Sequence, residues 1–290
     1  MTTDLIVDGN SVYARAFYAV QASTGNPRDA LCAALNTVIA LLNDHNGNLG
    51  SRPDRLLFAW DGAGGRDKHR QPKPNDYYAV AELVVGHLDL LFHAAQHVSD
   101  SYEADDIVAT AVENSAQDTT VYVVSGDKDL QQLAGHHTFY YSLNKKAVLN
   151  NRAILDHWHV KSPRQIAIAQ AILGDKVDLV GGIKGWGPAK VKKLFEAVTP
   201  EMTFEEAFDV ILAQIPAQTR DGFLADLDLT LLHTDVPDVP EPAPIVPADL
   251  AVAEKLRLPG LMDFYRPFYR RYSKRTATVI DGDEEDIPKD

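Results

Sequence analysis

The stretch "DLIVDGNS" (residues 4–11) combines a short apolar run with an aspartate directly after it. The same arrangement recurs in "RLLFAWDG" (residues 55–62) and in "TVYVVSGDKD" (residues 120–129). Short apolar runs bounded by turn-forming residues are typical of buried strands in a parallel sheet. The three stretches therefore predict an α/β domain in which each strand delivers an aspartate to one shared edge of the sheet.

Helical patterns surround these strands and dominate the second half of the chain. Apolar residues recur at helical spacing in residues 27–44, 77–97, 103–115, 162–174 and 203–215. The helix at 162–174 is framed by a capping box of Ser162 and Gln165 and is stopped by Gly174, and the helix at 203–215 begins with a second capping box, Thr203 and Glu206. Three further elements are expected: an edge hairpin over 138–149, a proline-rich connector over 236–247, and a last helix before "DFYRPFYRRYSKR" (263–275). The acidic stretch at 281–290 is expected to be disordered.

The composition excludes several classes of protein. No run approaches roughly 18 uninterrupted apolar residues, so a membrane helix is not expected. The N-terminus lacks the basic and apolar segments of a signal peptide. A single cysteine, Cys32, cannot form an internal disulfide, which fits a reducing cytoplasm. The expectation is a cytoplasmic, monomeric protein without a membrane partner.

The net charge of −13 argues at first against nucleic acid as a partner. Its distribution is uneven, however. Residues 145–193 contain ten lysines and arginines and only three acids, a local charge of +7. A basic region on an acidic body is typical of a phosphate-binding surface. On charge alone, a solvated helical surface is the favoured explanation of the pattern.

Seven carboxylates are predicted to converge on the shared edge of the sheet. Four follow the strands and three begin the helix in "YEADDIVATA" (102–111). These residues are Asp8, Asp61, Asp127 and Asp129, and Glu103, Asp105 and Asp106. Taken singly, each is a common turn or helix-start residue. Taken together they would repel one another unless cations lie between them, and all-oxygen ligands favour Mg²⁺ or Mn²⁺. Two such ions about 4 Å apart are the usual arrangement for hydrolysing phosphodiesters.

Five blocks of sequence, in this order, make the chain similar to a known family. They are "LIVDGNSVYARAF", "FAWD", "YEADDIVATA", "VVSGDKDLQQL" and "GDKVDLVGGIKGWGPAKVKKL", which together span roughly residues 4–195. The chain resembles the 5′-nuclease family of flap endonucleases and 5′→3′ exonucleases. That family includes the nuclease domain of bacterial DNA polymerase I and free-standing bacteriophage enzymes.

The resemblance implies a fold, a domain division and an activity. The fold is a PIN-like, Rossmann-like parallel sheet with helices on both faces, followed by a helical part with a helix–hairpin–helix (helix-3-turn-helix) element. Residues 1–160 would form the catalytic domain, with an arch or clamp near 62–98. Residues 161–235 would bind DNA, and 236–290 would hold the connector, a C-terminal helix and the acidic tail. The implied activity is Mg²⁺-dependent hydrolysis of DNA at 5′ flaps, overhangs and nicks, in replication and repair.

The resemblance also implies site residues. Asp175 and Asp178 join the seven carboxylates above to complete a two-ion Mg²⁺ site, for which Mn²⁺ would substitute. We expect Asp8, Asp61, Glu103 and Asp105 nearer one ion, and Asp127, Asp129, Asp175 and Asp178 nearer the other. Catalytic basic residues are expected at Lys73, Arg66 and Arg70. Contacts to DNA are expected from Gly182, Lys184, Gly185, Gly187, Lys190, Lys193 and Arg15, with a K⁺ ion at the glycine-rich hairpin turn.

Three departures from the family pattern bear on these expectations. The arch motif usually ends in arginine, whereas "PKPND" (72–76) ends in Asp76. Only 42 positions separate Asp61 from Glu103, which favours a reduced arch. Leu179 stands where the family usually has asparagine.

Two other functions share parts of the pattern: a non-catalytic binder of DNA junctions, and a PIN-type ribonuclease.

Overall fold

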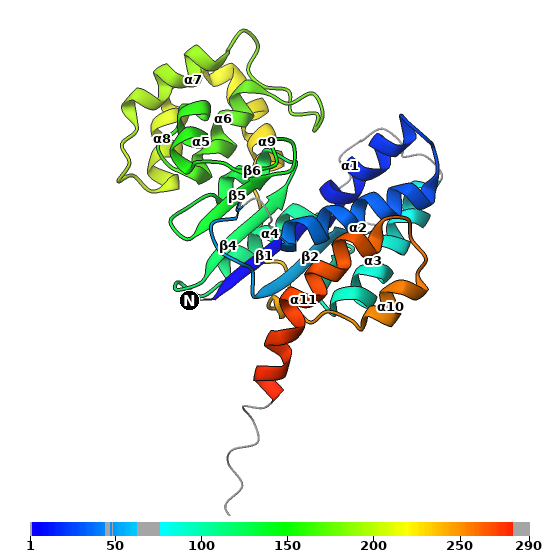
Figure 1. The fold of residues 1–290 in the computed structure, drawn as a ribbon. Helices are drawn as coiled ribbons and strands as arrows, with labels where there is room; N and C mark the ends of the chain where they lie inside the picture. Colours follow the sequence, from blue (N-terminus) through cyan, green and yellow to red (C-terminus); the bar gives the residue numbers. More distant parts are fainter. Residues whose placement is uncertain (1, 44–46, 48, 63–75, 281–290) are drawn as a thin grey trace, which may run out of the picture.

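The computed structural model describes residues 2–43, 47, 49–62 and 76–280, with side chains to residue 273 (Figure 1). Its sheet has the strand order β3-β2-β1-β4-β5-β6, and a short strand, β7, also pairs with β2. The strands are β1 (Thr3–Asp8), β2 (Arg55–Asp61), β3 (Ala95–Ser99), β4 (Thr120–Ser125), β5 (Thr138–Ser142), β6 (Ala147–Val148) and β7 (Ala243–Pro244). The first five strands pair in parallel, and β6 and β7 pair antiparallel to their neighbours. The predicted parallel α/β sheet and the edge hairpin of β5 and β6 are confirmed.

Helices cover both faces of the sheet, which is why the middle residues of its central strands are apolar on both sides. In β1, Leu5 and Val7 belong to one core and Ile6 to the other. One core is covered by α1 (Gly9–Gln21), α2 (Pro27–Asn43), α3 (Tyr77–Phe92), α10 (Leu250–Lys255) and α11 (Leu261–Ile280). The other is covered by α4 (Ala104–Glu113), α5 (Asn151–Trp158), α6 (Ile166–Leu173), α7 (Pro188–Leu194), α8 (Phe204–Gln214) and α9 (Arg220–Thr230). Figure 1 shows α5 to α9 gathered as a helical group beyond β5 and β6.

Short 3₁₀ turns complete the chain, and both capping boxes read from the sequence are present. The turns are η1 (Asp129–Leu133), η2 (Pro163–Gln165), η3 (Phe195–Ala197) and η4 (Ala217–Thr219). The predicted helix at 162–174 begins as η2 under the Ser162–Gln165 box and continues as α6. Among the described residues, no helix is both long and apolar enough to cross a bilayer.

The helix predicted over 77–97 is too long. It ends at Phe92, where His93 adopts φ +47° and its N–H bonds to the Asp89 carbonyl. Ala95–Ser99 then forms β3, which pairs in parallel with β2. The apolar spacing of a helix continues across this boundary, so only the long-range pairing with β2 decides the outcome.

A helix precedes the stretch "DFYRPFYRRYSKR", as predicted, and it is α10, but it is not the last helix. The stretch itself lies inside α11, despite Pro267. Tyr265, Phe268 and Tyr272 recur at helical spacing and are buried against the core. Tyr272 also bonds to the carbonyls of Leu42 and Pro53, because α11 packs against α2. The acidic stretch at 281–290 lies outside the described residues.

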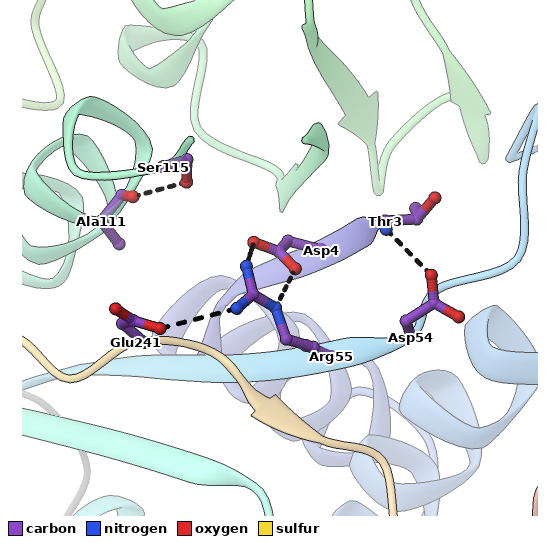
Figure 2. A network of polar contacts seen from close by, with 7 residues as sticks. All are labelled: Thr3, Asp4, Asp54, Arg55, Ala111, Ser115 and Glu241. Atoms are coloured by element: carbon purple, nitrogen blue, oxygen red, sulfur yellow. Dashed lines mark hydrogen bonds and ion pairs between the residues drawn. The ribbon is translucent and has the colours of Figure 1, made fainter. Parts of the chain in front are cut away.

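The amino ends of the strands carry a buried ion pair, at the edge opposite Asp8. Figure 2 shows Asp4 of β1 gripped by Arg55 of β2, with Nε–Oδ1 and Nη2–Oδ2 distances of 2.7 and 2.8 Å. Asp4 is fully buried. Glu241 of the proline-rich connector lies 3.6 Å from the same guanidinium, although its side chain is 90% exposed. The pair therefore joins β1 to β2 and lies beside the connector.

We expect Asp4→Ala to destabilise the fold by about 3 kcal/mol, because it leaves the Arg55 guanidinium without its bidentate partner. Urea unfolding measures the change. Glu241→Gln is the matched control, because an exposed partner contributes little and its loss should lower stability by less than about 1 kcal/mol. Equal losses in the two variants would contradict this account of the ion pair.

Candidate metal centre and nucleic-acid surface

Three adjacent strands bring their carboxyl ends to one edge of the sheet. Asp8 ends β1 and Asp61 ends β2, while Asp127 and Asp129 follow β4 directly. The register places Asp8 opposite Ala59, and Val7 opposite Val124, so these strands end at the same level. The sequence-based prediction of an acidic edge is in this respect correct.

Asp8 is buried, and both of its carboxylate oxygens accept hydrogen bonds. Its Oδ1 accepts the N–H of Ser11 at 2.9 Å and caps α1, and its Oδ2 accepts the Ser125 hydroxyl at 2.6 Å. Burial raises the pKa of Asp8 to about 6, although these hydrogen bonds lower it and the charge of Asp127 adds slightly to the rise. A buried carboxylate of this kind is costly to ionise without a cation beside it.

Asp8→Asn is expected to stabilise the metal-free protein, increasingly as the pH rises. The carboxyl ionises near 3.8 in the unfolded chain and near 6 in the fold. Between these values ionisation favours the unfolded state, and above them Asp8 costs about 3 kcal/mol that asparagine avoids. Urea unfolding in EDTA at about pH 4.5 and about pH 8 measures the difference between the two proteins. A difference that does not change with pH would contradict the buried carboxylate.

The start of α4 combines a capping box with a hydrogen bond to the end of β2. Asp61 accepts the Ala104 N–H at 2.8 Å, which fixes β2 to the helix start. Asp106 uses its Oδ2 for the Glu103 N–H at 3.4 Å and its Oδ1 for the His233 N–H at 2.8 Å. Both oxygens of this predicted metal ligand are thus engaged by the backbone. Asp105 accepts the Asp106 N–H at 2.9 Å and is only half-buried.

A second group of carboxylates lies where the loop after α6 meets η1. Oxygens of Asp129, Asp175 and Asp178 all lie within 4.8 Å of one another. The Gln170 amide donates to Oδ1 of Asp129 and orients it. The N–H of Asp129 donates to Asp127 Oδ1 at 2.9 Å, so Asp127 borders the group. An all-oxygen set of this spacing fits a hard divalent cation.

Lys128 neutralises part of this second group. Its Nζ lies 2.5 Å from Oδ2 of Asp175. Burial raises the pKa of Asp175, but the hydrogen bond and charge of Lys128 outweigh it and leave the pKa lowered. For Lys128, burial acts to lower the pKa, but the hydrogen bond to Asp175 and the charges of the neighbouring aspartates outweigh burial and leave the pKa raised. Both groups are therefore charged at neutral pH.

The loop of residues 174–187 joins α6 to α7 and carries two of the three carboxylates. Asp175 and Val180 exchange backbone hydrogen bonds of 2.9 and 2.8 Å, which closes a tight turn. Leu179 takes φ +58° in this turn, a conformation that asparagine tolerates better than leucine. Gly182, at φ +69°, is required, since a Cβ there would lie 2.7 Å from the Gly174 nitrogen.

Two backbone N–H groups of the glycine-rich turn donate to a side chain of α9. The N–H groups of Gly181 and Gly182 donate to the two carboxylate oxygens of Asp226 in α9, at 3.0 and 2.7 Å. The Gly182 N–H, which was predicted to contact phosphate, is bonded to Asp226 in this structure, and the phosphate contact stays a prediction. Gly185, at φ +82°, has no atoms within 4 Å of an added Cβ, and Gly187 likewise lies open.

The basic residues predicted to bind DNA differ in their contacts and exposure. Nζ of Lys190 lies 4.6 Å from the ring centroid of Trp186, within cation–π range. Lys184 and Lys193 are exposed. Arg15 of α1 donates to the Asn144 side chain at 2.8 Å, beside the β5–β6 turn. Lys73, Arg66 and Arg70 lie outside the described residues.

Sequence reasoning missed four residues that hold this edge together: Ser125, Lys128, Gln170 and Asp226. Lys128 carried a signal, because a lysine between two site aspartates is conspicuous in "GDKD" (126–129). Asp226 carried none, since it lies 44 residues beyond Gly182 in an ordinary helical pattern.

Residues 3–159 match the family described as "5'-3' exonuclease, N-terminal resolvase-like domain". DNA polymerase I of Rhizobium leguminosarum is 28% identical over 298 residues, covering 97% of this chain but only 29% of that protein. A "5'-3' exonuclease" of Mycoplasmopsis pulmonis is 26% identical over 252 residues and is matched over 81% of both chains. The chain thus spans less than a third of that polymerase but most of the shorter exonuclease.

Solved structures share the fold. The bacteriophage T5 flap endonuclease, in a complex with DNA and metal ions, superposes with a TM-score of 0.63 at 16% identity. That match covers 92% of this chain and 98% of the T5 chain. Human GEN1, in complex with Holliday junction DNA, gives a TM-score of 0.58 at 14% identity, over 95% of this chain and 74% of GEN1. At these identities the likeness concerns the fold.

Proposed function

The chain belongs to the 5′-3′ exonuclease family through its N-terminal resolvase-like domain, and on this premise we propose that it is a structure-specific 5′ nuclease. It would hydrolyse DNA phosphodiesters at 5′ flaps, overhangs and nicks. The observation that carries the proposal is the group of Asp129, Asp175 and Asp178, whose oxygens lie within 4.8 Å of one another beside the acidic edge of the sheet. The T5 structure with the same fold contains both DNA and metal ions.

Two Mg²⁺ ions are the proposed cofactors, with Mn²⁺ able to replace them. Asp8, Asp61, Glu103 and Asp105 would hold one, and Asp129, Asp175 and Asp178, bordered by Asp127, the other. When bound, the ions would stabilise the charge that develops on the reacting phosphate. The protein's own contribution is orientation: Ser125 holds Asp8, and Gln170 holds Asp129. Asp106 serves in this scheme as a support that ties α4 to residue 233.

The α6–loop–α7 unit is the proposed helix–hairpin–helix element. Its open turn at Gly185 and Gly187, with the lysines nearby, would approach duplex phosphates, and K⁺ is the proposed monovalent ion there. Residues 161–235 would then be the DNA-binding domain and residues 1–160 the catalytic one. After residue 235 the chain returns to the catalytic domain, where β7 pairs with β2 and α11 packs against α2.

Lys190→Ala combined with Lys193→Ala is expected to weaken duplex binding and to flatten its salt dependence by about two units of slope, one for each phosphate contact. Fluorescence anisotropy over a range of KCl concentrations measures both. Lys255→Ala with Arg270→Ala is the matched control, because both side chains are exposed and belong to α10 and α11, which cover the opposite face of the sheet from α7. A slope that equals that of the control would remove Lys190 and Lys193 from the DNA surface.

A substrate comparison tests the proposed function against its two alternatives. The 5′-labelled substrates are a 5′-flap DNA, the matching 3′-flap DNA and single-stranded RNA of the same sequence, each with Mg²⁺ or EDTA. We expect cleavage of the 5′ flap near its junction, only with Mg²⁺. Tight binding of the flap without any cleavage would indicate the non-catalytic junction binder. Preferential cleavage of the RNA would indicate a PIN-type ribonuclease.

A further inference from the structure

Lys128 places a positive charge inside a group of residues proposed to bind a metal ion. It follows Asp127 and precedes Asp129, and its Nζ lies 2.5 Å from Oδ2 of Asp175. The other oxygen of Asp175 accepts the Val177 N–H at 2.8 Å, so the carboxylate is held from both sides. The ammonium is thus fixed against the edge of the three-carboxylate group.

The Lys128 ammonium also lies near the Trp158 ring. Its Nζ is 5.8 Å from the ring centroid of Trp158, at the limit of cation–π contact. That ring is fixed, because its indole N–H donates to Gln131 at 2.8 Å. The Lys128 side chain is 42% exposed, against 10% for Asp175. A flexible lysine stem can therefore leave Asp175 while the ammonium stays near the indole face or reaches water.

We propose that Lys128 is a built-in counter-ion of the Asp129–Asp175–Asp178 group, which a divalent cation must displace from Asp175 in order to bind. Two cations on the same carboxylate repel strongly at such distances. Without metal, the ammonium relieves the repulsion among the three carboxylates and keeps the loop after α6 against η1. This inference rests on the proposed function, because it assumes that the group binds a divalent ion.

When the ammonium is removed, the affinity for a divalent ion and the melting temperature of the metal-free protein should move in opposite directions. Removing the ammonium should tighten divalent binding at this group, because the competitor is gone. It should also lower the melting temperature of the metal-free protein, because the carboxylates then repel without compensation. A lysine that merely supports Asp175 as a ligand would instead weaken metal binding when removed.

Lys128→Met tests this, because methionine keeps much of the length and removes the charge. Mn²⁺ binding to the metal-free protein is measured by calorimetry and by electron paramagnetic resonance, and melting is followed in EDTA. We expect the affinity for one Mn²⁺ to rise at least about tenfold and the melting temperature in EDTA to fall. Lys128→Arg should bind Mn²⁺ like the unmodified protein. Lys176→Met, an exposed lysine of the same loop, is the matched control and should change neither quantity.

If Lys128→Met does not fold in EDTA, Lys128→Gln supplies the same comparison with a polar side chain. Unchanged or weaker Mn²⁺ binding in the neutral variants would overturn the inference while leaving the proposed nuclease intact. Failure of the unmodified protein to bind Mn²⁺ at all would overturn both the metal centre and this inference. Because binding is measured without DNA, neither outcome depends on cleavage.

Discussion

Asp178→Asn should lower the single-turnover rate of 5′-flap cleavage by about 10³-fold, because one negative charge is removed from a group that holds its ion through three carboxylates. Asparagine keeps the shape of this largely buried side chain, so the fold should persist. DNA affinity in EDTA should hold or rise, since each acid removed lessens repulsion of the phosphate backbone. The rate is measured with saturating enzyme, and binding by anisotropy on the same preparation.

Asp118→Asn is the control for this change, because Asp118 is an exposed acid in the turn before β4. It should cleave and bind like the unmodified protein. If Asp178→Asn cleaves at nearly the normal rate, the three-carboxylate group is not the catalytic metal site. If it binds flap DNA much more weakly at an unchanged melting temperature, Asp178 contacts the substrate instead of a metal.

Asp226→Ala should lower the affinity for Mn²⁺ and for duplex DNA together, each by about 10-fold to 100-fold, as expected for a residue that holds a ligand-bearing loop. Its carboxylate binds two successive N–H groups of a loop that carries Asp178 on one side and the open glycine turn on the other. The variant leaves both donors without their partner, so the loop loses its fixed position on α9.

Asp228→Ala on the same helix is the matched control, since Asp228 is exposed. Asp226→Asn should show an intermediate loss, because one amide oxygen can still accept one of the two N–H groups. Binding is measured by calorimetry for Mn²⁺ and by anisotropy for DNA. Normal affinity for both in Asp226→Ala would mean that the loop keeps its position without the α9 contact.

The acidic edge could be predicted from sequence because its signal is local. Each of β1, β2 and β4 is an apolar run followed within a few residues by aspartate, and parallel pairing brings such residues to one edge. The capping boxes at Ser162 and Thr203 are local as well, and both are present in the structure. Where neighbouring residues decide the conformation, sequence patterns were sufficient.

Other features depend on contacts between distant parts of the chain. Residues 95–99 became a strand because β2 offered a parallel partner, and residues 263–275 became helix because α2 offered an apolar surface. The bond from Asp226 to the glycine turn, and that from Asp106 to residue 233, join segments far apart in sequence. No spacing rule reports such pairs, and for this reason the sequence pattern showed nothing of the backbone contacts that occupy both oxygens of Asp106.

The most direct measurement is anomalous diffraction from a crystal of the metal-free protein soaked in Mn²⁺. The account predicts an anomalous peak among the oxygens of Asp129, Asp175 and Asp178, and a second beside Asp8, Asp61, Glu103 and Asp105. Both peaks should disappear on back-soaking in EDTA. The result that would contradict the central claim is a crystal soaked in excess Mn²⁺ that shows no anomalous peak at these carboxylates, from a protein that still cleaves 5′ flaps. This edge would then not be the metal centre.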